Sequence, residues 1–323
     1  MSTAFIGTSD FAAAVLERLA RSEGHRPELV ITRPDRPSGR GRRLTAPPVA
    51  ATARALGLAL EQPQNVNDPQ SRALIAQALG ADGASSTHRS NALIVCAFGA
   101  LIKEPLLSEH DVLNVHPSLL PRWRGAAPVE RAIMAGDERT GVSIMRLTAG
   151  LDSGPVCLAG AEPIRAEDTY GSLAARLQEL GGELLLRALD EAPPFVEQPE
   201  EGATYAEKLG PADRQLDPAR PAGELERVVR ALHPHIGARV ELADGSMLGV
   251  HRAALLEAAD AQQVQASGVL AKGDSEPGPY ARDGRLLLDC ALGVLELLVV
   301  QPPGGRAMDA SSYLRGHGLP ARR

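Results

Sequence analysis

Short apolar runs alternate with helical patterns over the first half of the chain. Residues 4–6 are apolar and lead to Gly7, and Asp10 then precedes apolar residues at helical spacing up to Leu19. Further strands are expected at 29–31, 93–96, 112–115 and 142–145, and further helices at 48–57, 69–79 and 169–190. Apolar strands that alternate with helices predict an α/β fold, with a mostly parallel sheet that helices cover on both faces.

The pattern changes after residue 190. Residues 191–210 are rich in Pro, Glu and Gly and show little periodicity, which predicts a linker. A short helix is then expected at 221–232, followed by a hairpin with its turn at Asp244–Gly245. Apolar runs at 269–270, 286–288 and 292–300 complete the pattern of a small β-barrel or sandwich. We therefore expect a first domain at 1–190, a linker at 191–210, a second domain at 211–310 and a tail at 311–323.

The composition is that of a globular protein. Hydrophobic residues make up 44% and charged residues 23% of the 323 residues, which excludes the disordered, collagen-like and coiled-coil classes. No apolar run reaches the roughly 18 residues of a membrane helix, and the first ten residues lack the pattern of a secretory leader. We therefore expect a cytoplasmic protein without a membrane partner. The three widely spaced cysteines predict reduced thiols.

Candidate catalytic residues lie at the end of the strand expected at 112–115. Asn114 and His116 are two residues apart, so their side chains point to the same face, at the edge where open α/β sheets carry their sites. An amide that stabilises an oxyanion and an imidazole that moves a proton suit acyl transfer. Asp152, in the sequence Gly-Leu-Asp-Ser-Gly, is a third candidate, which would orient His116. The alternatives are a structural histidine and a plain turn.

A basic segment lies between Arg33 and Arg43. It holds five arginines and one Asp, a local charge of +4 in a chain whose net charge is -6. Its Gly and Pro residues predict a loop that is neither helix nor strand, and such a loop can reach phosphates and base edges. A basic loop that is merely solvated is the alternative. Because the whole chain is acidic, any contact with nucleic acid must be local.

Two cofactor classes are not expected. The segment after Gly7 lacks the G-x-G-x-x-G pattern that binds dinucleotides, so we expect no nicotinamide cofactor. The sequence His233-Pro234-His235 has a proline between its histidines and no third ligand nearby, so we expect no metal.

Several segments resemble the methionyl-tRNA formyltransferase family, over essentially the whole chain. They are FIGTSDFA near the start, the basic segment, AFG at 97–99, NVHPSLLPRWRGAAP from Asn114, GLDSG around Asp152 and QPPGGRAM near the end. The resemblance implies a Rossmann-like, folate-binding and catalytic domain, followed by a small OB-like β-barrel domain that helps to hold tRNA. It also implies a monomer that transfers the formyl group of 10-formyltetrahydrofolate, its co-substrate, to the amino group of initiator methionyl-tRNA.

The resemblance implies roles for individual residues. Asn114, His116 and Asp152 correspond to the family's catalytic trio. The residues that line the folate pocket are then Ser118, Leu119, Leu120, Pro121, Phe98 and Gly99. The residues that contact tRNA are then Arg36, Arg40, Arg42, Arg43, Arg122, Arg124, Lys208 and Arg306. For Arg122 and Arg124 the alternative is packing or pairing near the site, and for Lys208 it is simple solvation.

Two other functions stay open on the sequence. A related folate-dependent N-formyltransferase that acts on an amino sugar or another small amine shares the trio, but needs neither the basic segment nor the QPPGGRAM ending. A non-catalytic RNA-binding protein on the same fold does not need an intact trio. Residues 211–323 include 13 basic and 14 acidic residues, so the second domain is near neutral rather than broadly basic.

Overall fold

The computed structural model describes residues 1–38, 43–80, 91–256 and 278–317, and its internal contacts divide the chain into two compact units. The first unit comprises Met1–Pro128, Arg139–Pro163 and Ala174–Glu207. The second comprises Val129–Glu138, Ile164–Leu173 and Lys208–Arg323. Each unit has its own sheet and its own buried core.

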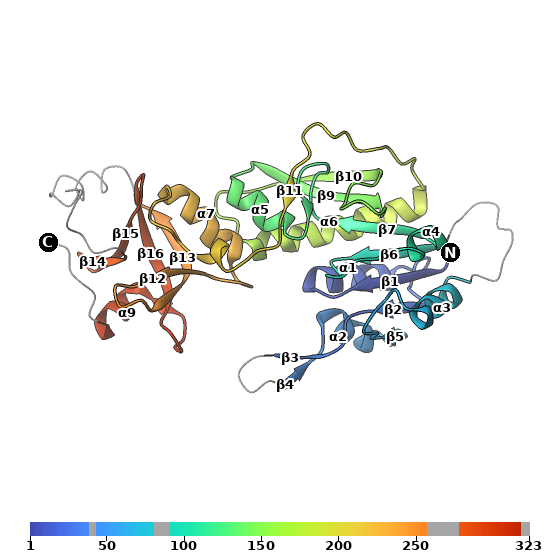
Figure 1. The fold of residues 1–323 in the computed structure, drawn as a ribbon, viewed down its shortest axis with the longest axis horizontal. Helices are drawn as coiled ribbons and strands as arrows, with labels where there is room; N and C mark the ends of the chain where they lie inside the picture. The colour runs from blue at the N-terminus through green and yellow to red at the C-terminus, as the bar shows by residue number, and fades with distance from the viewer. Residues whose placement is uncertain (39–42, 81–90, 257–277, 318–323) are drawn as a thin grey trace. The chain divides into compact units, whose positions relative to one another are not determined.

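A seven-stranded sheet forms the centre of the first unit, in the order β10-β9-β7-β6-β1-β2-β5 (Figure 1). Its strands are β1 (Thr3–Gly7), β2 (Leu29–Ile31), β5 (Leu60–Glu61), β6 (Ala92–Cys96), β7 (Asp111–His116), β9 (Arg139–Arg146) and β10 (Val156–Pro163). The run from β7 to β5 is parallel, whereas β9 and β10 pair antiparallel. The mostly parallel sheet confirms the predicted α/β class.

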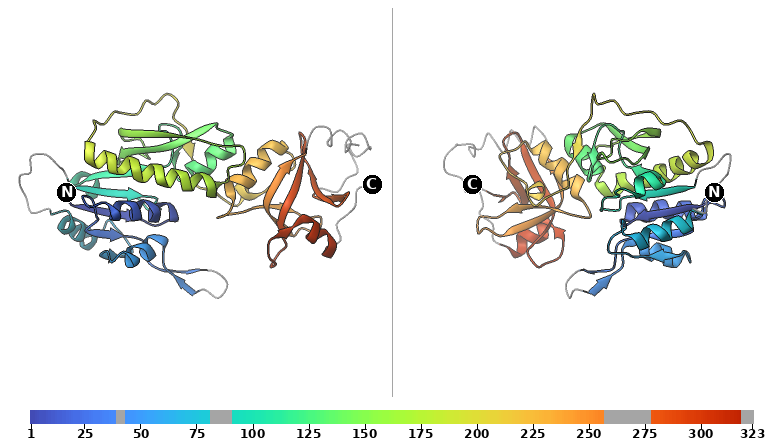
Figure 2. Two further views of the ribbon diagram at one scale, coloured as in Figure 1. Left: turned by 180° about the vertical axis from the view of Figure 1, so that it is seen from behind. Right: turned by 45° about the vertical axis from the view of Figure 1, so that its right-hand side comes forward.

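Helices cover both faces of this sheet (Figure 2). On one face lie α1 (Asp10–Arg21), α2 (Pro48–Ala55) and α6 (Tyr170–Glu191), and on the other lie α3 (Pro69–Ala78) and α4 (Leu106–Glu109). A side chain on Gly181 of α6 would come within 3.1 Å of Val115, so this glycine lets the helix pack closely on the strand that ends at the candidate site. Continuous apolar strands require this double cover.

The prediction that the basic segment contains no strand is wrong. β3 (Arg36–Ser38) and β4 (Arg43–Thr45) form a two-stranded antiparallel ribbon, in which Pro37 faces Leu44. Each strand of an isolated ribbon has an unpaired edge, so proline is tolerated there although it donates no N–H. We call β3 and β4 the arginine hairpin. Arg40 and Arg42 lie outside the described residues, as does the apolar run at 269–270.

The second unit is built on an antiparallel sheet in the order β12-β13-β16-β15-β14, with β17 paired to β16. Its strands are β12 (Ala238–Glu241), β13 (Met247–Leu255), β14 (Tyr280–Arg282), β15 (Arg285–Asp289), β16 (Val294–Gln301) and β17 (Met308–Asp309). Its helices are α5 (Pro128–Ala135), η1 (Ala212–Arg214), α7 (Ala222–Leu232) and α9 (Ala310–Gly316). The antiparallel sheet confirms the predicted change of fold after the first domain, while its closure into an OB-like barrel stays a prediction.

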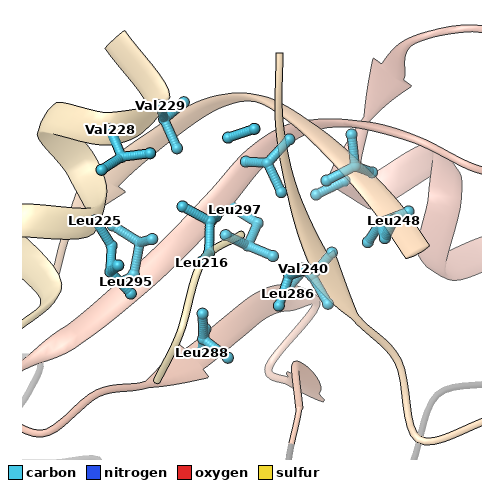
Figure 3. Close-up of a cluster of buried hydrophobic side chains, with 14 of the residues drawn as sticks. Leu216, Leu225, Val228, Val229, Val240, Leu248, Leu286, Leu288, Leu295 and Leu297 are labelled. Carbon is cyan, nitrogen blue, oxygen red and sulfur yellow. The ribbon is translucent and has the colours of Figure 1, made fainter. Parts of the chain in front are cut away.

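The core of the second unit lies between α7 and this sheet (Figure 3). Four residues of α7 follow one another at helical spacing and are buried against strand residues such as Leu297, namely Leu225, Val228, Val229 and Leu232.

None of the helices within the described ranges combines the length and the apolar character that a membrane span needs.

Two segments that precede residue 190 in the sequence belong to the second unit, Val129–Glu138 and Ile164–Leu173. Arg131 of α5 forms an ion pair with Asp213 at 2.7 Å. The Arg227 Nε donates to the Met134 carbonyl oxygen at 3.1 Å. Contacts across such long sequence separations leave no periodic signal, so a boundary drawn from composition at residue 190 does not reveal them.

Acid pH is expected to destabilise the second unit through His233. Burial, and then the neighbouring His251 and His235, lower the pKa of His233 below its ordinary value of 6.5. Its buried Nδ1 has no hydrogen-bond partner in the described part of the chain. Below about pH 6.5 the unfolded chain therefore binds more protons than the folded chain, so the free energy of unfolding falls as the pH drops.

Thermal unfolding of wild type and His233→Phe at pH 7 and pH 5.5 measures this effect. We expect the Tm of the wild type to fall by about 1–3 °C more than that of the variant over this range. Parallel decreases in the two proteins would contradict the assignment of the titrating group to His233.

Candidate active site

Asn114 and His116 stand on the last part of β7, the strand between β6 and β9 in the first unit. Both are buried, with 8% and 4% of their surface exposed. Their alternation with Val115 points the amide and the imidazole to one side of the sheet, as their spacing predicted. The site therefore begins at the carboxyl end of a parallel strand, the edge at which open α/β sheets bind ligands.

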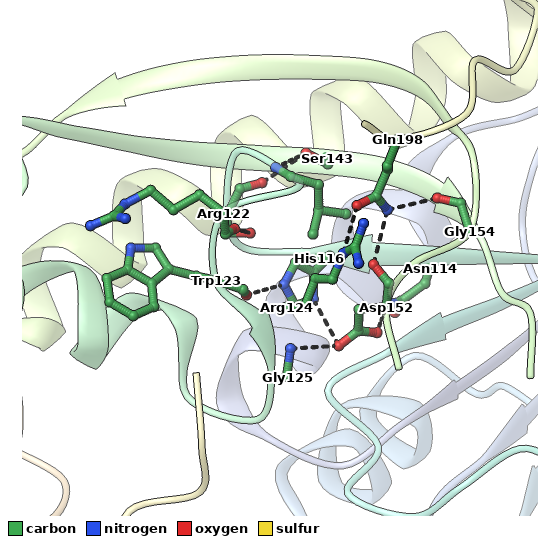
Figure 4. A network of polar contacts seen from close by, with 12 residues as sticks. Asn114, His116, Arg122, Trp123, Arg124, Gly125, Ser143, Asp152, Gly154 and Gln198 are labelled. Carbon is green, nitrogen blue, oxygen red and sulfur yellow. Dashed lines mark hydrogen bonds and ion pairs between the residues drawn. The ribbon is translucent and has the colours of Figure 1, made fainter. Parts of the chain in front are cut away.

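Asp152 meets both of these side chains (Figure 4). Its Oδ2 lies 3.7 Å from the His116 Nδ1, and its Oδ1 lies 3.5 Å from the Asn114 Nδ2. The backbone N–H of Gly125 donates to the same Oδ2 at 2.9 Å. The structure thus brings the three predicted catalytic residues together, from a strand and from a turn 38 residues away in sequence.

The other nitrogen of His116 is held by the backbone. Its Nε2 lies 2.9 Å from the carbonyl oxygen of Trp123, and because a carbonyl oxygen only accepts, this nitrogen carries the hydrogen. A neutral His116 then has its unprotonated nitrogen, Nδ1, directed at Asp152. This nitrogen can take up a proton beside a carboxylate that stabilises the resulting cation.

Residues 121–127 are fixed by the segment expected to be a linker. β8 (Arg124–Gly125) pairs in parallel with β11 (Tyr205–Ala206). The N–H of Trp123 donates to the Thr204 hydroxyl at 2.9 Å. Gly125 has φ +116, and a Cβ there would lie 2.8 Å from the Ala206 carbonyl oxygen, so only glycine fits this position. The close pairing of β8 with β11 places the N–H of Gly125 where it donates to the Asp152 carboxylate.

The sequence did not indicate Gln198, which completes the network. Its Nε2 donates to the carbonyl oxygens of Asp152 and Gly154, at 2.9 and 2.7 Å (Figure 4). A glutamine in a polar, proline-rich segment carries no motif, and its role depends on contacts 46 and 44 residues away in sequence. Only the folded chain could reveal it.

The segment from Ser118 to Pro121 continues directly from β7. Ser118 is fully buried and donates from its hydroxyl to the Arg122 carbonyl oxygen at 2.7 Å, so it shapes the segment. The Ser143 hydroxyl donates to the Ser118 carbonyl oxygen at 2.8 Å and accepts from the Leu120 N–H at 3.2 Å. The three residues that follow Ser118 are half-buried and present apolar surface, namely Leu119, Leu120 and Pro121.

The other two residues predicted to line the folate pocket follow β6. Phe98 is buried, with 6% of its surface exposed, and packs in the core that α3 and α4 cover. Gly99 is exposed and has φ +72, and its carbonyl oxygen accepts from the Arg33 Nη1 at 2.9 Å. This bond ties the segment after β6 to the start of the basic segment.

The two arginines beside Trp123 have different surroundings. The Arg122 guanidinium carbon lies 4.4 Å from the centroid of the Trp123 ring, a cation–π contact. The Arg124 side chain is only 2% exposed and lies 3.3 Å from a carboxylate oxygen of Glu200. These contacts favour the alternative that the sequence left open, packing and pairing near the site, and contact of either arginine with tRNA stays a prediction.

The remaining predicted tRNA residues within the described ranges are on the surface. Arg36 and Arg43 are exposed on the arginine hairpin of the first unit, and Lys208 and Arg306 are exposed in the second unit. At the base of the hairpin the Gln62 Nε2 donates to the Asp35 Oδ1 at 2.7 Å and to the Arg33 carbonyl oxygen at 2.9 Å. The hairpin therefore has a hydrogen-bonded base.

The three cysteines lie in buried or half-buried positions. Burial raises the pKa of the Cys96 and Cys157 thiols, and it raises the pKa of Cys290 to about 12, so all three are neutral near pH 7 and poor nucleophiles. No group of three or more His, Cys, Asp or Glu residues within those ranges is arranged to hold a metal ion.

Two family models match the chain. The formyl transferase model matches residues 1–189, and the model of the formyl transferase C-terminal domain matches residues 208–318. The chain is 40% identical to the methionyl-tRNA formyltransferase of Ruegeria pomeroyi over 324 residues, which covers 99% of this chain and 98% of the relative. It is 38% identical to that of Dechloromonas aromatica over 322 residues, with 99% and 97% covered.

Solved structures share the fold at low sequence identity. An N-formyltransferase from Helicobacter canadensis, in complex with folinic acid and dTDP-3-aminofucose, has a TM-score of 0.61 at 12% identity, with 91% of this chain and 98% of that chain covered. The methionyl-tRNA formyltransferase from Clostridium thermocellum has a TM-score of 0.57 at 13% identity, with 79% and 94% covered.

A third structure, HypX from Aquifex aeolicus in complex with tetrahydrofolic acid, has a TM-score of 0.60 at 16% identity. The match covers 97% of this chain but only 46% of HypX, so this chain corresponds to about half of that protein. These distant structures show the fold alone. The family is shown by the relatives of about 40% identity, which match almost the whole chain. The chain belongs to the methionyl-tRNA formyltransferase family.

Proposed function

We propose that this protein transfers the formyl group of 10-formyltetrahydrofolate to the amino group of initiator methionyl-tRNA, giving N-formylmethionyl-tRNA for translation initiation. The observation that carries the proposal is the convergence of Asn114, His116 and Asp152 at the carboxyl end of β7. An amide and an imidazole that both face one carboxylate supply the donor and the proton relay that acyl transfer needs. The relatives of full length add the substrate class.

The reaction requires one bond to form and one to break. The amine nitrogen bonds to the formyl carbon, the bond from that carbon to N10 of the folate breaks, and the proton lost by the amine ends on N10. An α-amino group has a reference pKa of about 7.7–8.0, so an appreciable fraction is unprotonated near neutral pH and a strong base is unnecessary. The residues of the chain are therefore needed to stabilise the charge that develops on the formyl oxygen and to transfer the proton from the amine to N10.

We assign the roles from the contacts. The Asn114 Nδ2 carries two hydrogens, so it can face Asp152 and donate to the formyl oxygen as negative charge develops there. The His116 Nδ1 takes and returns a proton, because Nε2 is committed to the Trp123 carbonyl oxygen. Asp152 stabilises the protonated imidazole across 3.7 Å.

The residues beside the trio fit a folate. Leu119, Leu120 and Pro121 present half-buried apolar surface, which suits a flat pteridine ring. Ser118 acts indirectly, because its hydroxyl is spent on the Arg122 carbonyl oxygen. Phe98 and Gly99 would contribute to the same pocket from the end of β6.

For tRNA we propose the arginine hairpin as the main contact, with Lys208 and Arg306 as additional contacts. Arg36 and Arg43 lie on the two strands of the hairpin, and Arg40 and Arg42 fall between them in the sequence, so this segment is strongly basic in a chain of net charge -6. Arginines bind phosphates through paired hydrogen bonds. We further propose an OB-like second domain that helps to hold tRNA, a monomeric state and a cytoplasmic location without a membrane partner.

Removal of one hairpin charge is expected to weaken tRNA binding. Arg43→Ala should raise the Kd for initiator methionyl-tRNA several-fold and reduce the slope of log K against log salt by about 1, because one phosphate contact releases about one counterion. Titration of tRNA binding at several salt concentrations measures both. Arg21→Ala is the control, since it removes another exposed arginine, on α1. Identical slopes for Arg43→Ala and wild type would exclude this contact.

The function itself is tested by formyl transfer from 10-formyltetrahydrofolate to charged initiator methionyl-tRNA, beside elongator methionyl-tRNA, free methionine and a nucleotide-linked amino sugar. We expect transfer to the initiator tRNA with strong preference over the other acceptors. Transfer to the amino sugar alone would instead establish the small-amine formyltransferase. Salt-sensitive tRNA binding without transfer to any acceptor would establish a binding protein.

A further inference from the structure

We propose that Gln198 and Arg124 form a clasp that holds Asp152 in its working position, which makes Gln198 a positioning residue for formyl transfer. The proposal rests on the proposed function and adds to it a residue outside the trio. Gln198 comes from the polar segment after α6, where no motif marks it. The clasp joins three segments of the first unit, residues 124–125, 152–154 and 198–200.

The orientation of the Gln198 amide is fixed by its partners. The Arg124 Nε, which can only donate, lies 3.0 Å from the Gln198 Oε1. The carbonyl oxygens of Asp152 and Gly154, which can only accept, lie 2.9 and 2.7 Å from the Nε2. The two hydrogens of the amide nitrogen are therefore donated to two carbonyl oxygens of one turn, and the amide oxygen accepts from one arginine.

The turn needs such support at Asp152. This residue has φ 45, in the left-handed region that residues other than glycine adopt uncommonly, although Asp and Asn tolerate it better than most. A conformation of this kind persists where surrounding bonds fix it, and it clusters at functional sites. Gln198 binds the backbone on both sides of Ser153, so it opposes relaxation of the turn to negative φ.

Arg124 links the backbone and the side chain of Asp152. Its side chain is 2% exposed, is held by Gln198 and lies 3.3 Å from Glu200, and the next residue on β8 is Gly125. The N–H of Gly125 then donates to the Asp152 Oδ2 at 2.9 Å. The backbone of Asp152 is therefore held by Gln198, and its carboxylate by Gly125 beside Arg124, so that the carboxylate stays directed at His116.

Gln198→Glu separates the contact with Arg124 from the contacts with the Asp152 turn. It keeps the size of the side chain and an oxygen for Arg124, but it replaces the donating nitrogen with an oxygen that repels the carbonyls of Asp152 and Gly154. We expect kcat to fall by about 10- to 100-fold with the KM of both substrates within about twofold of wild type, because misplacement of a catalytic group by about 1 Å has effects of this size. Gln198→Ala should behave similarly.

Amide hydrogen exchange gives a second readout that does not depend on activity. Exchange over residues 150–155 should be faster in both variants than in wild type, while the Tm and the exchange of the central sheet stay unchanged. Gln77→Ala is the control, an exposed glutamine of α3 whose removal should change neither quantity.

Each outcome decides the proposal. Wild-type kcat in Gln198→Glu, or unchanged exchange over residues 150–155, would overturn it, and so would a loss of kcat accompanied by global destabilisation in both variants. A wild-type protein that formylates no methionyl-tRNA would remove the proposed function. The exchange experiment would still decide whether Gln198 holds the Asp152 turn, so the two failures are distinguishable.

Discussion

Replacement of His116 by alanine is expected to lower kcat for formyl transfer by about 10²–10⁴-fold, the contribution of a positioned acid–base group. The physical reason is specific to this ring. Its Nε2 is bound to the Trp123 carbonyl oxygen, so Nδ1 alone is available to relay the proton, and Nδ1 faces Asp152 at 3.7 Å. Alanine removes both the relay and the cation that Asp152 stabilises.

Two measurements accompany this variant. Single-turnover formyl transfer gives the chemical step, and a tRNA binding titration gives the Kd, which should stay within about twofold of wild type because the imidazole is buried and lies on β7 rather than on the arginine hairpin. His116→Gln preserves more of the volume of the ring and controls for the cavity that alanine leaves. Near-normal turnover in both variants would exclude His116 from the reaction.

Asp152→Asn is the second variant with a large expected effect, a loss of about 10²–10⁴-fold in kcat. The change keeps the shape of the side chain but removes its negative charge and turns one oxygen into a donor. If the remaining oxygen keeps the bond from the Gly125 N–H, the new amide nitrogen faces the Asn114 Nδ2, donor against donor. The protonated form of His116 then has no anion beside it.

The comparison of Asp152→Asn with Asp152→Ala tests this reasoning. A role that depends on charge predicts similar losses of kcat in both variants, with KM for the tRNA and for the folate little changed. A role in shaping the turn alone predicts that asparagine, which also tolerates left-handed backbone, restores the activity. Restored activity in Asp152→Asn would therefore remove Asp152 from the proton relay.

Much of the fold was predictable because its signals are local. The buried strands β1, β6, β7 and β9 each contain an apolar run predicted from the sequence, and α7 lies within one residue of its predicted range. The basic segment was predicted incorrectly, because Pro and Gly usually mark loops and a short two-stranded ribbon tolerates Pro37 at an unpaired edge.

The candidate site was predictable only in part. The spacing of Asn114 and His116 placed both on one face of a strand, since side chains alternate along every strand. That Asp152 lies beside them followed from the family resemblance and from a glycine-rich turn, and the distances of 3.5 and 3.7 Å depend on the folded chain. Gln198 was not predicted at all.

The sequence by itself determined which residues alternate between core and surface, and therefore the α/β first unit, the antiparallel sheet that follows and the residue types that carry chemistry. These properties depend on neighbours a few positions apart. Only the tertiary structure decided that Trp123 holds one nitrogen of His116, that Gly125 donates to Asp152, and that Gln198 joins Arg124 to the Asp152 turn across 74 and 46 residues. Hydrogen bonds of this kind are set when distant backbone segments pack together, and packing over such separations leaves no period in the sequence.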